Sequence, residues 1–344
     1  MNITPNILLI YTGGTIGMIK NFETGALVAF DFDELLLNIP ELKQLDCTID
    51  TISFREPIDS SDMDVERWKE LGDIISQAYD KYNGFVVLHG SDTMSYTASA
   101  VSFMFENLTK PIIFTGSQLP IGDLRTDAKE NLITAVQIAA LQEKGKPVIN
   151  EVGLYFEYKL LRANRTTKIN AEHFEAFQSL NYPSLVESGV HLKVNKSFLR
   201  PVNRRKKVVY HTHFDNNVII IKMFPGINKY ILQHIFSSKN IKGVIIETYG
   251  AGNTTTKKWF IDILTKTIKS GIPIINVTQC SGGSVEMGKY NTSIALKKAG
   301  VISGKDITTE AAVAKLMYLL GENLPLKVLK TIYETSLRGE MSEN

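Results

Sequence analysis

Short apolar runs of strand length alternate with amphipathic segments of helical period along most of the chain. Such runs predict buried strands, and the amphipathic segments predict helices that cover them. Strands are predicted at 7–11, 47–55, 84–88, 111–114 and 152–156. Helices are predicted to start at 33–37 and to extend over 66–82, 95–106 and 127–143. This alternation predicts an α/β fold with a mostly parallel sheet and crossover helices.

The alternation breaks down between 182 and 207 and then resumes. The irregular stretch contains a basic run at 203–207, which could bind phosphate but is more typical of a solvated linker between domains. Further strands are predicted at 218–221, 243–247 and 273–277, and further helices near 231 and over 259–270, 309–320 and 325–337. We therefore predict an N-terminal catalytic α/β domain at 1–190, a linker at 191–215 and a smaller C-terminal α/β domain at 216–344.

Glycine and hydroxyl residues follow three of the predicted strands, at 12–14, 89–92 and 115–117. Any one of these segments alone could be a tight turn or a loop that presents backbone N–H groups to a ligand. Because the carboxyl ends of parallel strands meet at one edge of a sheet, where ligands bind, the three segments together predict a site there.

Composition narrows the class of partner and the compartment. The formal net charge of +2 gives no electrostatic case for nucleic acid or an anionic membrane, and no apolar run approaches the length of a membrane-spanning helix. Cys47 and Cys280 are too few for a disulfide framework and fit a reducing compartment. The N-terminal apolar run lacks the features of a signal peptide, so we expect a cytoplasmic protein.

The motifs disfavour several kinds of chemistry. The histidines show no metal-ligand spacing except the pair His211 and His213 in the predicted linker, so no metal site is expected. The chain has no phosphate-binding GxxxxGK[ST] motif. The spacing of Gly13, Gly14 and Gly17 differs from GxGxxG, which weakens a dinucleotide-binding hypothesis.

The remaining side chains suit acyl transfer. A threonine hydroxyl such as that of Thr12 can attack a carbonyl if a base takes its proton, and glycine N–H groups can hold the oxyanion. Lys168, which follows two threonines, is a candidate to relay that proton, although its spacing alone is more typical of a surface lysine. The polar segment 59–62 can cap the following helix, and ligand binding stays open for the residues that capping leaves over.

Two segments in particular resemble the signature motifs of the bacterial-type asparaginases, Thr12-Gly13-Gly14-Thr15-Ile16-Gly17 and His89-Gly90-Ser91-Asp92-Thr93-Met94. The likeness continues at 59–63, 115–118, 164–168, 249–253 and 278–280 and so covers nearly the whole chain. In its details the chain is most similar to the type I, cytoplasmic group of L-asparaginases. The resemblance implies hydrolysis of L-asparagine to L-aspartate and ammonia without a cofactor, by a homotetramer built from tight dimers.

The resemblance also implies roles for single residues. Thr12 would be the nucleophile that forms a β-aspartyl ester, and Ser91, Asp92 and Lys168 would form a second hydroxyl–acid–base set. Asp92 would also bind the α-ammonium of the substrate. The α-carboxylate end would be held by Asp59, Ser60 and Ser61. Asn253 is a weaker candidate for a contact across a subunit interface.

Two departures from the family pattern concern the catalytic groups. Ser91 replaces the usual threonine of the second motif, so the hydroxyl is kept and we expect function with looser positioning. The loop after the first strand often carries a catalytic tyrosine in the family, but residues 18–30 contain none. Tyr290 could supply a phenol instead, as in some type I relatives, or it could be an ordinary packed tyrosine.

A third departure concerns regulation. Type I enzymes can carry a second asparagine site that uses an arginine where this chain has Glu247. Because an acid cannot pair with the effector's carboxylate, we expect no activation by that route. Ser117, Thr167 and Cys280 belong to the same set of candidate intersubunit or regulatory positions, and Thr167 and Cys280 could then be merely structural.

Two other functions remain open from the sequence. The amidase subunit of a tRNA-dependent amidotransferase shares both signatures, and a glutaminase-type amidohydrolase would use the same groups. An asparagine-binding regulator without turnover is the alternative from a non-enzyme class. The preference between asparagine and glutamine is not set by the sequence, because one methylene is worth only about 1–3 kcal/mol in a pocket.

Overall fold

The first apolar run forms strand β1 (Asn6–Gly13), which lies inside the larger sheet. The computed structural model describes residues 4–20, 27–29, 39–288 and 291–343. The predicted helix start at 33–37 and Tyr290 lie outside these residues. By its internal contacts the chain divides into two units, residues 1–212 and 213–344, and the division falls inside the predicted linker 191–215.

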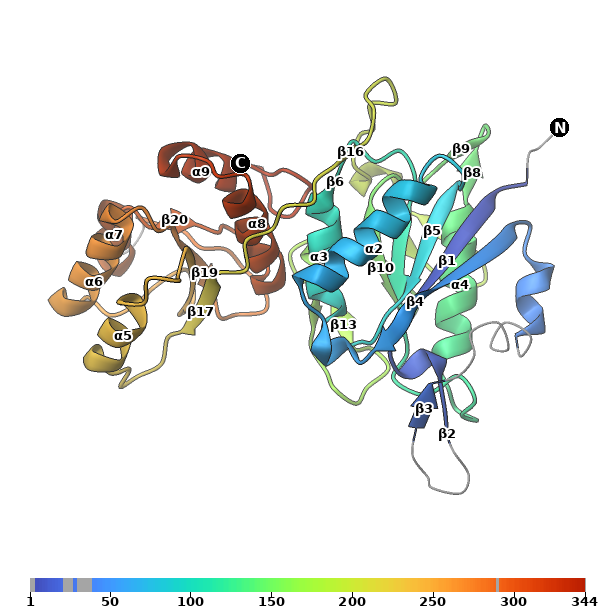
Figure 1. Cartoon of the computed structure of the whole chain (residues 1–344), viewed down its shortest axis with the longest axis horizontal. Helices are drawn as coiled ribbons and strands as arrows, with labels where there is room; N and C mark the ends of the chain where they lie inside the picture. Colours follow the sequence, from blue (N-terminus) through green and yellow to red (C-terminus); the bar gives the residue numbers. More distant parts are fainter. Residues whose placement is uncertain (1–3, 21–26, 30–38, 289–290, 344) are drawn as a thin grey trace. The chain divides into compact units, whose positions relative to one another are not determined.

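The larger sheet of the first unit has the strand order β15-β14-β11-β10-β7-β5-β1-β4. Neighbours from β4 to β10 are parallel, and those from β10 to β15 are antiparallel. Their bounds are β4 Thr48–Ile58, β5 Gly84–Leu88, β7 Ile112–Thr115, β10 Val152–Phe156, β11 Lys159–Arg162, β14 Val186–Glu187 and β15 Lys193–Val194. The prediction of a mostly parallel sheet with crossover helices is confirmed, and β1, β4 and β5 lie side by side in Figure 1.

Three helices of the first unit cross between its parallel strands, α2 (Val65–Ala78), α3 (Met94–Met104) and α4 (Ala128–Ala140). Helix α4 packs on the face of the sheet that carries the odd-numbered residues of β1, and together they form one buried apolar cluster. Helices α2 and α3 are joined by a hydrogen bond of 3.1 Å from Trp68 Nε1 to Thr97 Oγ1. This packing fixes the strand ends that carry the polar motifs.

Short elements complete the first unit. The strands are β2 Met18–Lys20, β3 Leu27–Ala29, β6 Phe105–Glu106, β8 Gln142–Glu143, β9 Lys146–Pro147, β12 Thr167–Lys168, β13 Phe177–Gln178 and β16 Val209–Tyr210. The 3₁₀ turns are η1 Thr15–Gly17, η2 Pro40–Gln44, η3 Ser60–Asp62, η4 Ala163–Arg165 and η5 Lys196–Phe198.

The segment predicted as a linker is in contact with the first unit along much of its length. Strand β15 extends the larger sheet, and β16 pairs with β6. In the basic run, the Arg204 guanidinium donates hydrogen bonds to the carbonyls of Thr109 and Pro147 and to the Asn150 side chain. These contacts leave Arg204 engaged with the protein rather than only with solvent.

The second unit contains a parallel sheet of order β17-β18-β19-β20. Its strands are β17 Val218–Lys222, β18 Gly243–Thr248, β19 Ile274–Thr278 and β20 Ile302–Ser303. Its helices are α5 Lys229–Phe236, α6 Lys258–Lys269, α7 Asn291–Ala299, α8 Thr309–Gly321 and α9 Leu326–Tyr333. None of the helices in the described parts of the chain is long and apolar enough to cross a membrane.

A fully buried ion pair joins α8 to the C-terminal segment of the second unit. Lys315 Nζ lies 2.5 Å from Glu340 Oε1, and neither side chain is exposed. Lys315 also donates to the carbonyls of Tyr333 and Thr335, while Glu340 accepts from the main-chain N–H groups of Leu337 and Arg338. Burial of two charges is tolerated here because both groups have several hydrogen-bond partners.

Candidate active site

The glycines of the first motif allow three strand ends to pack closely together. Gly13 and Gly14 have φ angles of 127° and 88°, which L-residues with a side chain rarely adopt. A Cβ atom on Gly13 would overlap the main chain of Ile58, and one on Gly14 would lie 2.5 Å from the Cα of Gly90. The ends of β1, β4 and β5 therefore meet at one place, and two of them, those of β1 and β5, are among the three strand ends that the sequence predicts to converge.

The two threonines of this motif lie in different surroundings. Thr12 is 1% exposed, and its hydroxyl donates a hydrogen bond of 3.0 Å to the Leu88 carbonyl inside the sheet. Thr15 begins η1 and is partly exposed. It directly follows Gly14, which touches Gly90, just as Ser91 directly follows Gly90. The hydroxyl of Thr12, the nucleophile predicted from the sequence, is thus engaged inside the sheet, and Thr15 is the more exposed of the two threonines.

The end of β4 turns into η3, which carries the predicted carboxylate-binding residues. The Asp59 carboxylate accepts hydrogen bonds from the Ser61 main-chain N–H at 2.8 Å and from the Ser61 hydroxyl at 2.5 Å. These bonds hold the pKa of Asp59 below its usual value. An ionised Asp59 would repel a carboxylate, so its observed contacts suit the orientation of Ser61 better than direct binding.

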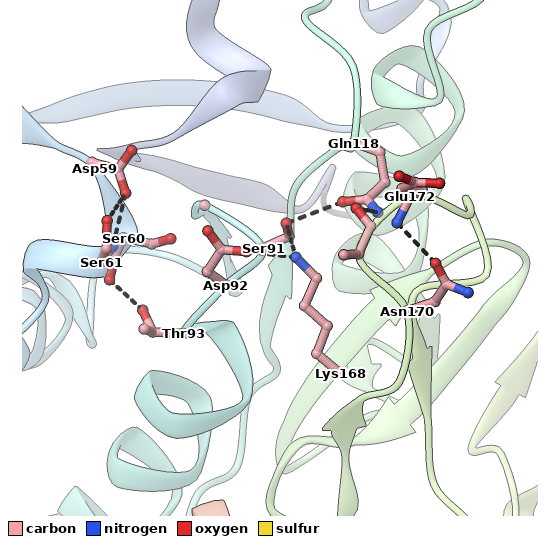
Figure 2. Close-up of polar contacts among 12 residues, drawn as sticks. Asp59, Ser60, Ser61, Ser91, Asp92, Thr93, Gln118, Lys168, Asn170 and Glu172 are labelled. Carbon is pink, nitrogen blue, oxygen red and sulfur yellow. Dashed lines mark hydrogen bonds and ion pairs between the residues drawn. The ribbon is translucent and has the colours of Figure 1, made fainter.

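Ser60 connects this turn to the second motif. Its side chain occupies the space that a Cβ on Gly90 would need, and its carbonyl accepts a hydrogen bond of 2.6 Å from the Thr93 hydroxyl. Figure 2 shows Asp59, Ser60 and Ser61 on one side of Asp92.

Lys168 contacts two polar residues of the second motif, Ser91 and Asp92 (Figure 2). Its Nζ donates hydrogen bonds to Ser91 Oγ at 2.9 Å and to Asp92 Oδ1 at 2.6 Å. The Lys168 side chain is 17% exposed, whereas that of Asp92 is 68% exposed. Lys168 is therefore held inside the site, and Asp92 keeps an oxygen accessible to a ligand. The burial of Lys168 and its two polar contacts do not fit the alternative that it is an ordinary surface lysine.

Gln118 is a member of this cluster that is not among the predicted site residues. Its Oε1 accepts a hydrogen bond of 3.1 Å from the Ser91 hydroxyl, and its Nε2 donates to the carbonyls of Ala171 and His173. In the sequence, Gln118 directly follows the segment 115–117, the third of the glycine and hydroxyl segments that follow predicted strands. That position predicts a location at the sheet edge but not the contact with Ser91.

His89 lies beneath the second motif and is fully buried. Burial lowers the pKa of His89 from 6.5 to about 4, so the ring is neutral at physiological pH. Its Nδ1 lies 2.7 Å from the Gly90 carbonyl, which fits an Nδ1–H donor, and its Nε2 has no hydrogen-bond partner among the described residues. The neutral ring therefore supports the backbone that leads into Ser91.

Two family descriptions match the sequence. The N-terminal asparaginase domain matches residues 6–200, and the glutaminase/asparaginase C-terminal domain matches residues 217–333. The chain belongs to the asparaginase family.

Relatives of this family member are similar over most or all of their length. L-asparaginase 1 of Escherichia coli is 40% identical over 98% of both chains. The crystal structure of L-asparaginase I from Vibrio cholerae superposes with a TM-score of 0.90 at 38% identity, covering 99% of this chain and 100% of the other. A glutamyl-tRNA(Gln) amidotransferase chain of Sulfolobus acidocaldarius is 35% identical over 98% of this chain and 75% of its own length.

The remaining candidate residues of this asparaginase-family chain are divided between the two units. In the first unit, Ser117 is buried and donates to the Leu119 carbonyl, and Thr167 lies on β12. In the second, Asn253 forms an isolated bridge with Tyr249, and Cys280 is exposed.

Glu247 is the next-to-last residue of β18, and its carboxylate is already engaged. It accepts a hydrogen bond of 2.7 Å from the Thr309 hydroxyl, and Lys222 Nζ lies 3.6 Å away. The Glu247 carboxylate therefore has polar partners within its own unit. Within the described residues, no group of three His, Cys, Asp or Glu side chains is placed to hold a metal ion.

Proposed function

We propose that the protein hydrolyses L-asparagine to L-aspartate and ammonia. The main support for this proposal is the contact of Lys168 with both Ser91 and Asp92. These residues lie at the edge of the larger sheet where the strands that precede the two signature motifs end. The end-to-end identity of 40% to L-asparaginase 1 of Escherichia coli supports the same reaction. A hydroxyl, an amine and a carboxylate in one cluster can supply the polar groups that acyl transfer to water uses.

We propose that the reaction passes through an acyl-enzyme on a threonine of the first motif. The threonine oxygen attacks the side-chain amide carbon, the C–N bond breaks, and ammonia leaves with the proton that the threonine lost. Water then cleaves the ester and releases aspartate. The partial exposure of Thr15 and its place next to Gly14 support Thr15 rather than the buried Thr12 as this nucleophile.

The surrounding side chains have complementary roles in this proposal. Lys168 is the base, and Ser91, which is in contact with Lys168, aligns the reacting hydroxyl. Asp92, largely exposed, binds the α-ammonium of the substrate. Ser60 and Ser61 bind the α-carboxylate, and Asp59 orients the Ser61 hydroxyl.

A second candidate is glutamine hydrolysis within a tRNA-dependent amidotransferase, which the 35% identity to the Sulfolobus acidocaldarius amidotransferase chain favours. The side chains of the site suit either amide. The cytoplasmic location and the homotetramer stay predictions of the sequence.

The test is the release of ammonia from L-asparagine and L-glutamine by the purified protein, each measured over a range of concentrations. A larger kcat/KM for asparagine supports the proposal. A larger value for glutamine favours the amidotransferase alternative. Tight asparagine binding by calorimetry without ammonia release would show that the protein is a binding protein and would overturn the proposal.

A further inference from the structure

The Ser91 hydroxyl contacts one hydrogen-bond donor and one hydrogen-bond acceptor. Lys168 Nζ donates to Ser91 Oγ at 2.9 Å, and Ser91 Oγ donates to Gln118 Oε1 at 3.1 Å. A hydroxyl has a single proton and two lone pairs. The proton of Ser91 is therefore directed to Gln118 and one lone pair is occupied by Lys168, which leaves the other lone pair to accept a hydrogen bond from an attacking hydroxyl.

The amide of Gln118 is held in one orientation. Its Nε2 donates to the carbonyls of Ala171 at 3.1 Å and His173 at 3.0 Å. If the amide were flipped, its oxygen would face two carbonyl oxygens and its NH₂ group would face Ser91 (Figure 2), and both contacts with the carbonyls would be lost. Oε1 must therefore point to Ser91.

The main-chain groups that hold Gln118 in place are themselves held by hydrogen bonds. Asn170 Oδ1 accepts from the main-chain N–H groups of Glu172 and His173, which shapes the loop that offers the two carbonyls. The main-chain N–H of Gln118 donates to the Asp127 carboxylate, with a shorter distance of 2.9 Å. Gln118 is thus anchored at both its main chain and its side chain.

We propose that Gln118 is a positioning residue that sets the direction of the Ser91 hydroxyl. Residue 91 is a serine, which lacks the γ-methyl that restricts χ1 in threonine and therefore turns more freely. The hydrogen bond from Ser91 to Gln118 restricts the Ser91 side chain, as the methyl group of a threonine would restrict it by packing. This inference rests on the proposed function, because it assigns Ser91 a place in the reaction.

A double-mutant cycle tests this role. Gln118→Leu removes the acceptor and keeps the approximate volume, and we expect it to lower kcat about tenfold with little change in KM. In a Ser91→Thr background, the same substitution should lower kcat by less than about threefold, because the methyl now restricts residue 91. Equal losses in both backgrounds would overturn the proposal, since Gln118 would then act on something other than Ser91.

One further variant separates the acceptor of the Gln118 amide from its donors, and another serves as a control. Gln118→Glu keeps an acceptor for Ser91 but loses the two donated bonds to the loop, so kcat should fall less than in Gln118→Leu. Gln137→Leu, an exposed position on α4, is the matched control for the loss of a glutamine and should leave kcat and KM unchanged.

A readout without turnover separates failure of this inference from failure of the proposed function. In crystal structures of the cycle, residue 91 should occupy more than one χ1 rotamer only in the Gln118→Leu protein that retains Ser91. One rotamer there would refute the positioning role even if no substrate is hydrolysed. Absence of ammonia release by the unmodified protein, with the rotamers as expected, would refute the proposed function alone.

Discussion

Lys168 Nζ and Ser91 Oγ lie 2.9 Å apart although the two residues are 77 positions apart in the chain. Ser91 follows the buried strand β5, and Lys168 reaches it from β12, after the chain has passed through β10, β11 and η4. The contact therefore depends on the correct order of strands in the larger sheet. It also makes Lys168 the most direct target for a test of the site.

Substitution of Lys168 by methionine should lower kcat by about 10²–10⁴, because the base and the hydrogen-bond donor to Ser91 are lost together. KM should change less, since Asp92 and the serines of η3 remain. The measurement is steady-state ammonia release. Lys159→Met, an exposed position on β11, is the control and should keep full activity. An active Lys168→Met protein would contradict its role as the base.

The two threonines of the first motif are expected to respond differently to valine, which keeps the shape and removes the hydroxyl. Thr15→Val should abolish ammonia release and the formation of an acyl-enzyme. Thr12→Val loses one buried hydrogen bond to the Leu88 carbonyl and should cost about 1 kcal/mol of stability while activity remains. Trapping of the acyl-enzyme followed by mass spectrometry of the modified peptide identifies the residue. An inactive, folded Thr12→Val protein would restore Thr12 as the nucleophile.

His89 should make the first unit less stable in weak acid. Its pKa is about 4 when folded and near 6.5 when unfolded. The unfolded chain therefore binds more protons between these values, so stability is complete above pH 6.5 and falls as the pH is lowered towards 4. The loss from pH 7 to pH 5 should be about 2 kcal/mol.

The pH effect is measured by urea unfolding in a Trp259→Phe background, where the fluorescence of buried Trp68 reports on the first unit. His89→Asn, which does not titrate, should reduce the pH dependence by that amount whatever its absolute stability. An unchanged dependence would mean that His89 is not responsible.

The buried pair of the second unit should be sensitive to removal of one partner. Lys315→Met leaves Glu340 buried without its counter-charge and should cost about 3–5 kcal/mol in the free energy of unfolding. The double variant Lys315→Met/Glu340→Gln should cost less, because no lone charge remains. Lys258→Met, which breaks an exposed ion pair with Asp262, should cost below about 0.5 kcal/mol. A larger loss in the double variant than in the single would contradict this account.

Much of the fold follows from the apolar pattern. The runs at 84–88 and 152–156 are strands with those bounds, because they are buried on both faces and end at polar residues. The predicted helix ends are less accurate than these strand bounds. The predicted helix 325–337 ends at Tyr333, because the residues after it turn back to donate to Glu340.

The site was predictable where strand ends converge and less so where a side chain's direction matters. The meeting of Ser91, Asp92 and Lys168 followed from the motifs. The burial of Thr12 did not, because only the register of β1 against β5 places its hydroxyl beside the Leu88 carbonyl. Gln118 is not among the site residues predicted from the sequence. Two of its partners are the main-chain carbonyls of Ala171 and His173, and every residue type has such a carbonyl.

The bond of Lys315 to Glu340 places the segment around residue 340 in the interior of its unit. The amide hydrogens of Leu337 and Arg338 are donated to a buried carboxylate. They should therefore exchange with solvent deuterium only when the unit opens as a whole, as amides in core strands do. A variant that lacks Glu340 and the residues after it should accordingly be degraded.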